Sequence, residues 1–279
     1  MTSSKLYTCA KETLARFIRV MPDVPFSADD IHFEFVTKDT IYERFKALCA
    51  ELSPRRKVPE KHRRDLEEDL SGVAIIGKSK SAVLLRVDCE LPEAEFISTI
   101  AHELAHIYCA KKEIDGDHFI DVYGTGCLIG DIEDTDGISI GYTAWSETIA
   151  NYIARTIIPH DILTSEEAAG TIVCLLGELA HEREYRKYGF SRLFSYIMAC
   201  VSDIDRMLTT LDSPSCLIYK NQELAAETRL MFKSVLELIY ERIKSGQPWK
   251  ITKDFIDDFE VRYLMFVGMN ERFYKVNKL

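Results

Sequence analysis

The 279-residue chain lacks the sequence features of membrane, secreted, repeat and low-complexity proteins. No run of apolar residues is long enough to span a bilayer, and polar residues interrupt the segment after Met1, unlike the apolar core of a signal peptide. We therefore expect a cytoplasmic protein with no membrane partner. A repeat period and a low-complexity segment are also missing, and 47% apolar with 29% charged residues is typical of a globular protein.

Paired cysteines are missing too. The eight cysteines occur singly and none has CxxC spacing, which argues against a zinc ribbon or a redox motif and favours reduced, mostly buried thiols. The net charge of −10 makes nucleic acid an unexpected partner. Residues 55–64 are locally basic, but the acidic residues that follow favour a solvated loop and short helix there. A nucleic-acid contact through this run is the alternative interpretation.

The apolar residues change periodicity along the chain. Helical spacing predicts helices over residues 5–20 and 39–52, and alternation predicts a strand over 31–36 with His32 facing outward. Two β-rich runs at 72–77 and 82–87 are joined by a short polar link, which predicts a hairpin. Beyond residue 160 the pattern predicts four helices with apolar stripes typical of core, and the last two centre on residues 231–239 and 255–266.

The clearest chemical signal is His102-Glu103-Leu104-Ala105-His106, the HExxH pattern. On a helix, positions i and i+4 lie on one face, so His102 and His106 can bind one metal ion while Glu103 contacts a water beside it. Pro92 suits a first helical turn, and the following residues carry an apolar arc opposite the histidines. We expect a zinc site on this helix.

Catalytic zinc usually takes a third protein ligand, which the motif does not supply. Glu147 is the first choice, because it opens a predicted helix at 144–154, with Thr143 or Ser146 as its cap. His118 is the rival. Asn151, one turn after Glu147, is placed to accept a hydrogen bond from a ligand histidine.

The mechanism follows from these roles. The metal lowers the pKa of its water, and Glu103 takes the proton and later passes it to the leaving amine. His118, Tyr123 and Tyr142 are candidate oxyanion donors. The acidic loop at 113–143 is expected to overlie the cleft. If the run at 82–87 is a sheet edge beside the site, it can hold an extended peptide by backbone pairing.

The two motifs together resemble one known group. HELAH at 102–106, followed by Glu147-Thr148-Ile149-Ala150-Asn151 and a stretch that ends at Pro159, resembles the ImmA/IrrE family of zinc peptidases. The resemblance implies zinc held by His102, His106 and Glu147, with Glu103 catalytic. It also implies a zincin-like α+β fold with a small mixed sheet and helices on one side of it. Ile153 and the pair at 157–158 depart from the family's usual Phe and Leu residues.

The chain is therefore predicted to be an α+β zinc metallopeptidase that acts on a protein or peptide substrate. Residues 1–160 would form the zincin-like domain, and residues 161–279 a helical region. The alternative interpretation is a non-catalytic regulatory or binding protein that keeps the fold of the metal site.

Overall fold

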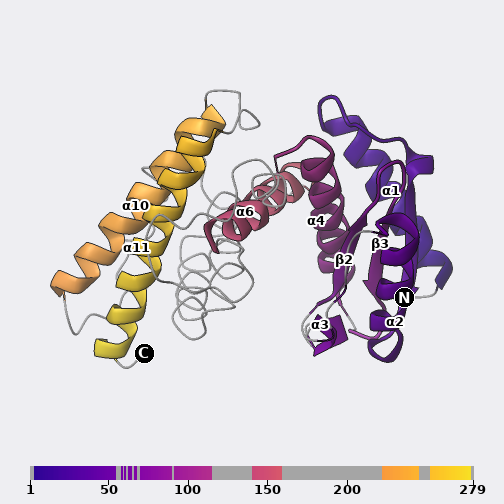
Figure 1. Ribbon diagram of the computed structural model, residues 1–279, viewed down its shortest axis with the longest axis horizontal. Coiled ribbons are helices and arrows are strands. Elements are labelled where there is room, and N and C mark those ends of the chain that lie inside the picture. The colour runs from indigo at the N-terminus through magenta and orange to yellow at the C-terminus, as the bar shows by residue number, and fades with distance from the viewer. Residues whose placement is uncertain are drawn as a thin grey trace. The chain divides into compact units, whose positions relative to one another are not determined.

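The computed structural model describes the chain over residues 3–54, 58, 60, 62–64, 66–67, 70–89, 91–114, 140–158, 222–244 and 252–277. These residues form a mostly helical α+β structure with one three-stranded mixed sheet (Figure 1). The chain divides into two compact units, residues 1–112 with 153–159, and residues 113–152 with 160–279. Residues around 160 lie outside the described ranges, so the predicted domain boundary there stays a prediction.

The first unit holds the predicted N-terminal elements. Helix α1 spans Ser3–Val20, the 3-10 turn η1 Ala28–Asp30, strand β1 Ile31–Val36, helix α2 Lys38–Leu52 and the short helix α3 His62–Arg64. Strands β2 (Gly72–Ile76) and β3 (Ser81–Arg86) form the predicted hairpin, and helix α4 follows at Glu93–Lys111. The predicted helices and strands of this region are confirmed to within a few residues at each end, and His32 is exposed as predicted.

The sheet has the strand order β1-β3-β2. Strand β1 runs parallel to β3, with Ile31 opposite Ser81, and β2 runs antiparallel to it, with Gly72 opposite Leu85. The condition under which the run at 82–87 would hold a peptide, that it is a sheet edge, is therefore not met. Almost every β3 side chain is buried, on both faces, which is typical of a central strand. The two edge positions belong to β1 and β2.

Both faces of the sheet are covered by helices. Side chains of β2 and β3 that point to one face, such as Ile75 and Leu84, share a buried cluster with the apolar stripe of α2. Leu85 points the other way, and Phe35 of β1 contacts Phe96 of α4 on that face. The expectation of helices on one side only is wrong, because a central strand that is apolar on both faces must bury both.

The segment between α2 and β2 is held by an arginine. Arg86 donates from Nη1 to the backbone carbonyl oxygens of Glu67, at 2.9 Å, and Leu70, at 3.4 Å, and its Nε donates to Asp88 at 3.1 Å. In the basic run, Arg63 pairs with Glu67 at 2.8 Å. The acidic residues around that run therefore engage at least one of its positive charges, as the solvated-segment interpretation expects.

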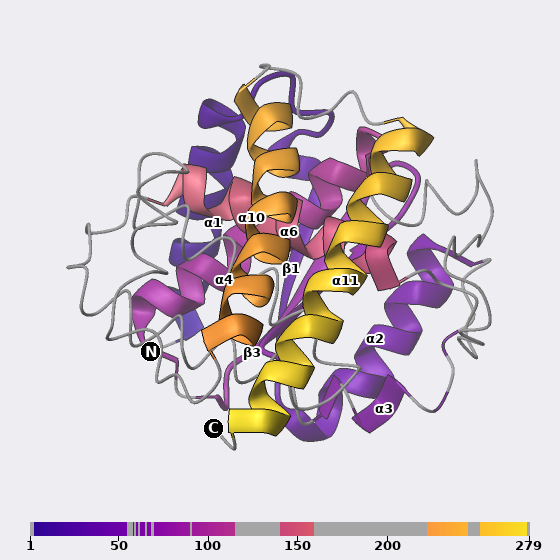
Figure 2. The same cartoon turned by 90° about the vertical axis from the view of Figure 1, so that its left-hand side faces the viewer.

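The second unit contains the predicted C-terminal helix pair. Helix α10 (Gln222–Lys244) and helix α11 (Lys253–Asn277) pack side by side (Figure 2), with Phe232 stacked on Phe266 at 4.8 Å between ring centroids. Trp145 of helix α6 (Ile140–Ile157) meets Phe255 edge to face. The last two predicted helices are confirmed, and the two predicted between 164 and 204 lie outside the described residues.

The described cysteines are reduced and mostly buried, as the sequence predicts. Cys9, Cys49 and Cys109 are buried, Cys89 is partly buried, and none of these four forms a disulfide. None of the described helices combines the length and the apolar character needed to cross a membrane.

Candidate metal centre

Helix α4 provides the scaffold of the candidate site. It begins directly after Pro92, whose fixed φ, here −53°, suits the start of a helix. Its first turn carries Glu93 and Glu95, whose negative charges interact favourably with the positive end of the helix dipole. It ends at Lys111, close before Glu113, which has a positive φ of 60°. A left-handed residue just after a helix is a common way to stop it. The boundaries are therefore set by local chemistry.

Two polar contacts hold α4 in place at its C-terminal end. The Tyr108 hydroxyl donates to the carbonyl oxygen of Pro22 at 3.1 Å, and burial raises the pKa of this phenol to about 12, so it stays protonated. Lys111 donates from Nζ to the carbonyl oxygens of Gly77 and Lys78 in the hairpin turn. Because the start of the β2–β3 turn and the segment after α1 are both bonded to this helix, its last turns are fixed against the sheet.

The two motif histidines lie one turn apart on α4, as the spacing predicts. Both are half-buried, and their Nε2 atoms are 2.9 Å apart. The rings meet edge to face, with 4.5 Å between centroids and an interplanar angle of 87°. The two imidazole nitrogens therefore converge on one point beside the helix.

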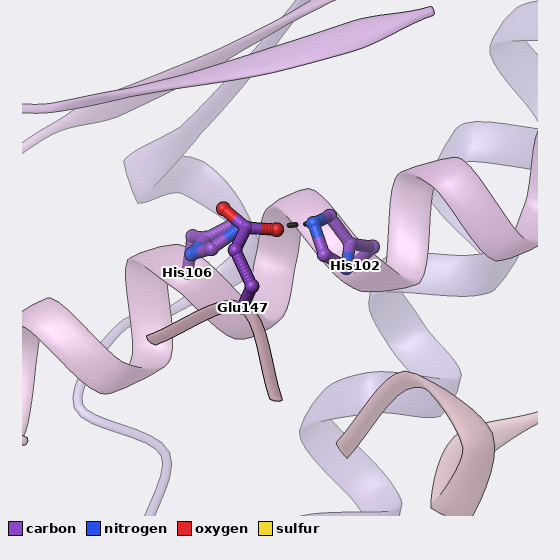
Figure 3. Close-up of side chains that lie close together, drawn as sticks. All are labelled: His102, His106 and Glu147. Atoms are coloured by element: carbon purple, nitrogen blue, oxygen red, sulfur yellow. Dashed lines mark hydrogen bonds between the residues drawn. The ribbon is translucent and has the colours of Figure 1, made fainter. Parts of the chain in front are cut away.

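Glu147 of α6 meets this pair. One ligand atom from each of His102, His106 and Glu147 lies within 4.8 Å of the others, and the three side chains point toward one another (Figure 3). The helix that carries Glu147 begins at Ile140, so Thr143 and Ser146 lie inside it. The prediction that one of them caps this helix is wrong. An N-cap must precede the first turn, and the helix extends through Gly141, which the sequence pattern assigned to the loop.

The donor set of this cluster fits zinc. Two imidazoles and one carboxylate are ligands of catalytic zinc sites, which keep a further position for a small molecule. Two nitrogens bound tetrahedrally at about 2.0–2.1 Å from one ion would be roughly 3.3 Å apart, so the pair needs to open by only a few tenths of an ångström. Hard cations such as Mg²⁺ favour oxygen-rich sites, and two nitrogen donors disfavour them.

Glu103 lies on α4 between the ligand histidines and the sheet. It is 7% exposed, and its Cγ is 3.2 Å from where a Cβ on Gly72 would stand. The side chain therefore passes the first residue of the edge strand β2. A carboxylate next to two candidate metal ligands, but outside the three-residue cluster, can accept a proton without being a ligand.

The other candidate residues fall into three groups. Asn151 donates from Nδ2 to the backbone carbonyl of Glu147 at 3.0 Å, and its role toward a histidine stays a prediction. His118, Tyr123 and most of the predicted 113–143 loop lie outside the described residues. Tyr142 lies in the first turn of α6, and its side chain is also outside the described part.

One residue beside the site was missed by the sequence interpretation. Gly72 was assigned only as the start of a β-rich run, yet it faces Thr99 and Glu103 across the strand–helix interface. A glycine that opens a strand otherwise rich in Val and Ile is the signal that could have identified a close approach.

Comparison with protein-family models, with curated proteins and with solved structures finds no match for this chain. The site is therefore interpreted from its own residues.

Proposed function

We propose that the protein is a zinc-dependent metallopeptidase that hydrolyses peptide bonds with Glu103 as the general base. The observation that carries the proposal is the convergence of His102, His106 and Glu147 from two helices that are far apart in the sequence. The HExxH helix supplies the two imidazoles, and α6 supplies the carboxylate. This combination of donors is the ligand set of the glutamate-ligated zinc peptidases.

The roles follow from the chemistry of each side chain. His102, His106 and Glu147 would hold the ion, which when bound supplies a Lewis acid and lowers the pKa of water. Glu103 accepts a proton at its carboxylate from the attacking water and delivers it to the leaving amine. Because Glu103 is almost fully buried, few waters compete with the reacting one for its oxygens.

We also propose that the sheet and helix α4 form a zincin-like core. Its support is the order of elements, a mixed sheet followed by an HExxH helix that packs on one face of that sheet. Strand β2 pairs with β3 along one edge, and within the described residues no strand pairs with its other edge. An extended peptide could add there by backbone hydrogen bonds, so β2, and not β3, is the strand that can hold a peptide beside α4.

Metal analysis and cleavage test the function together. Purified protein expressed with added zinc should contain close to one zinc per chain. It should cleave members of a pool of internally quenched fluorescent peptides of randomised sequence. Glu103→Gln should keep the metal and lose cleavage, because the amide cannot accept the proton.

The matched control is Glu95→Gln, an exposed glutamate on the same helix, which should retain cleavage. A protein without stoichiometric metal would refute the proposal. Full metal content with no cleavage of any peptide would instead favour the non-catalytic binding protein.

A further inference from the structure

The start of strand β2 approaches helix α4 more closely than a side chain allows. A Cβ placed on Gly72 would lie 2.7 Å from Cγ2 of Thr99, 3.2 Å from Cγ of Glu103 and 3.3 Å from Cδ2 of Leu85. The first distance is shorter than any normal carbon–carbon contact, and the other two are tight. Two side chains of helix α4 and one of strand β3 therefore leave no room for a side chain at this position.

The contacts to the helix follow from its period. Thr99 and Glu103 are four residues apart, so they lie one above the other on the face of α4 that meets β2. The histidines lie on an adjoining face, since each residue turns the helix by about 100°. Gly72 thus lies against the motif glutamate, which is outside the candidate ligand cluster, and an added side chain at Gly72 would press on both Thr99 and Glu103.

Neither helix residue can move without consequence. Thr99 is β-branched, and its hydroxyl donates to the carbonyl oxygen of Glu95 at 3.0 Å, so turning Cγ2 away costs a rotamer change and this hydrogen bond. Cγ of Glu103 lies between the backbone and the carboxylate, so a push on Cγ is passed on to the carboxylate that it carries. Catalytic groups must be held within about 0.5 Å of their productive position.

We propose that Gly72 is a positioning residue, and that the absence of a side chain there sets the position of the Glu103 carboxylate. The inference rests on the proposed function, because the position of Glu103 matters for proton transfer. The contacts that carry it are separate from the candidate metal ligands, since the three atoms nearest to a Cβ on Gly72 belong to Thr99, Glu103 and Leu85.

The test separates the helix contact from the Glu103 contact. In Gly72→Ala/Thr99→Ser the serine lacks Cγ2 but keeps its hydroxyl, so the shortest clash is removed and the contact with Glu103 stays. This variant should bind zinc normally and keep the KM of the Thr99→Ser parent on a cleaved member of the quenched-peptide pool. Its kcat should fall several-fold, since the 3.2 Å contact is relieved by a shift of a few tenths of an ångström and about 1 Å of misplacement can cost about 10²-fold.

The matched control is Gly77→Ala in the hairpin turn. The atoms nearest to a Cβ there are the backbone oxygens of Lys80 and Leu52 and Cβ of Leu52, so this variant should unfold more easily and keep the kcat of its folded fraction. A double variant with the kcat of its Thr99→Ser parent would overturn the inference. So would an effect on KM alone.

Unfolding of the metal-free protein gives a second, activity-independent readout. In the Thr99→Ser background, Gly72→Ala should lower the denaturant midpoint when Glu103 is present and have much less effect in Glu103→Ala, which lacks Cγ. If Gly72→Ala lowers the denaturant midpoint equally with Glu103 and in Glu103→Ala, the inferred contact between residue 72 and Glu103 is refuted. If the wild-type protein cleaves no peptide, the proposed function fails, and this cycle still decides whether Gly72 sets the Glu103 side chain.

Discussion

Replacing Glu147 with glutamine tests whether the carboxylate of α6 completes the metal centre. Glutamine keeps the length and helix propensity of glutamate but offers a neutral amide oxygen, which is a weak zinc ligand. In this variant the two histidines, whose Nε2 atoms are 2.9 Å apart, remain as candidate ligands. Metal that binds only the folded chain stabilises it, so the change can be read as a loss of zinc-induced stability.

The expected magnitude follows from linkage. At free zinc of about 1,000 times Kd, the folded protein gains about 4 kcal/mol. Groups that merely orient a ligand change metal affinity by about 10- to 100-fold, so loss of a ligand should weaken it at least about 100-fold. The same zinc concentration is then only about 10 times Kd, and the gain falls to about 1.4 kcal/mol.

The assay is denaturant unfolding followed by circular dichroism, with metal-stripped and zinc-buffered protein measured in parallel. Glu43→Gln is the control, because Glu43 is an exposed residue of α2 and should leave the zinc-induced gain unchanged. If Glu147→Gln gains as much from zinc as the wild-type protein, the reasoning about the third ligand is refuted. His118 would then become the better candidate.

Three further predictions concern the scaffold. Arg86→Met should lower the free energy of unfolding by about 2–4 kcal/mol, because two backbone carbonyls lose their donor, and a loss under about 0.5 kcal/mol in denaturant titration would contradict this. Gly268→Ala should raise it by about 0.5–1 kcal/mol, because the added Cβ in α11 meets no atom within 4 Å, and a lower melting temperature would refute this. The hydrogen bonds from Arg44 lower the pKa of Glu34 below its usual 4.5. The pair's stability is therefore present above pH 4.5 and lost as pH falls through the lowered value, and Arg44→Met should show a shallower acid dependence in unfolding.

The order of strands in the sheet could be predicted from the sequence only in part. The two β-rich runs and their short link predict a hairpin correctly, because a tight turn forces neighbouring strands to pair. Nothing local indicates that β1, which precedes α2, pairs in parallel with β3. That pairing crosses a helix and depends on how the apolar stripe of α2 packs on the sheet.

Features that depend only on neighbours along one helix or strand can be predicted from the residues alone. The period of 3.6 residues places His102 and His106 on one face of α4, and the same period makes Thr99 and Glu103 neighbours. The folded structure was needed to show that Glu147 reaches the histidines, that β2 lies at a sheet edge, and that Gly72 adjoins Glu103. These are contacts between separate elements, and they depend on how whole faces pack, which no local spacing encodes.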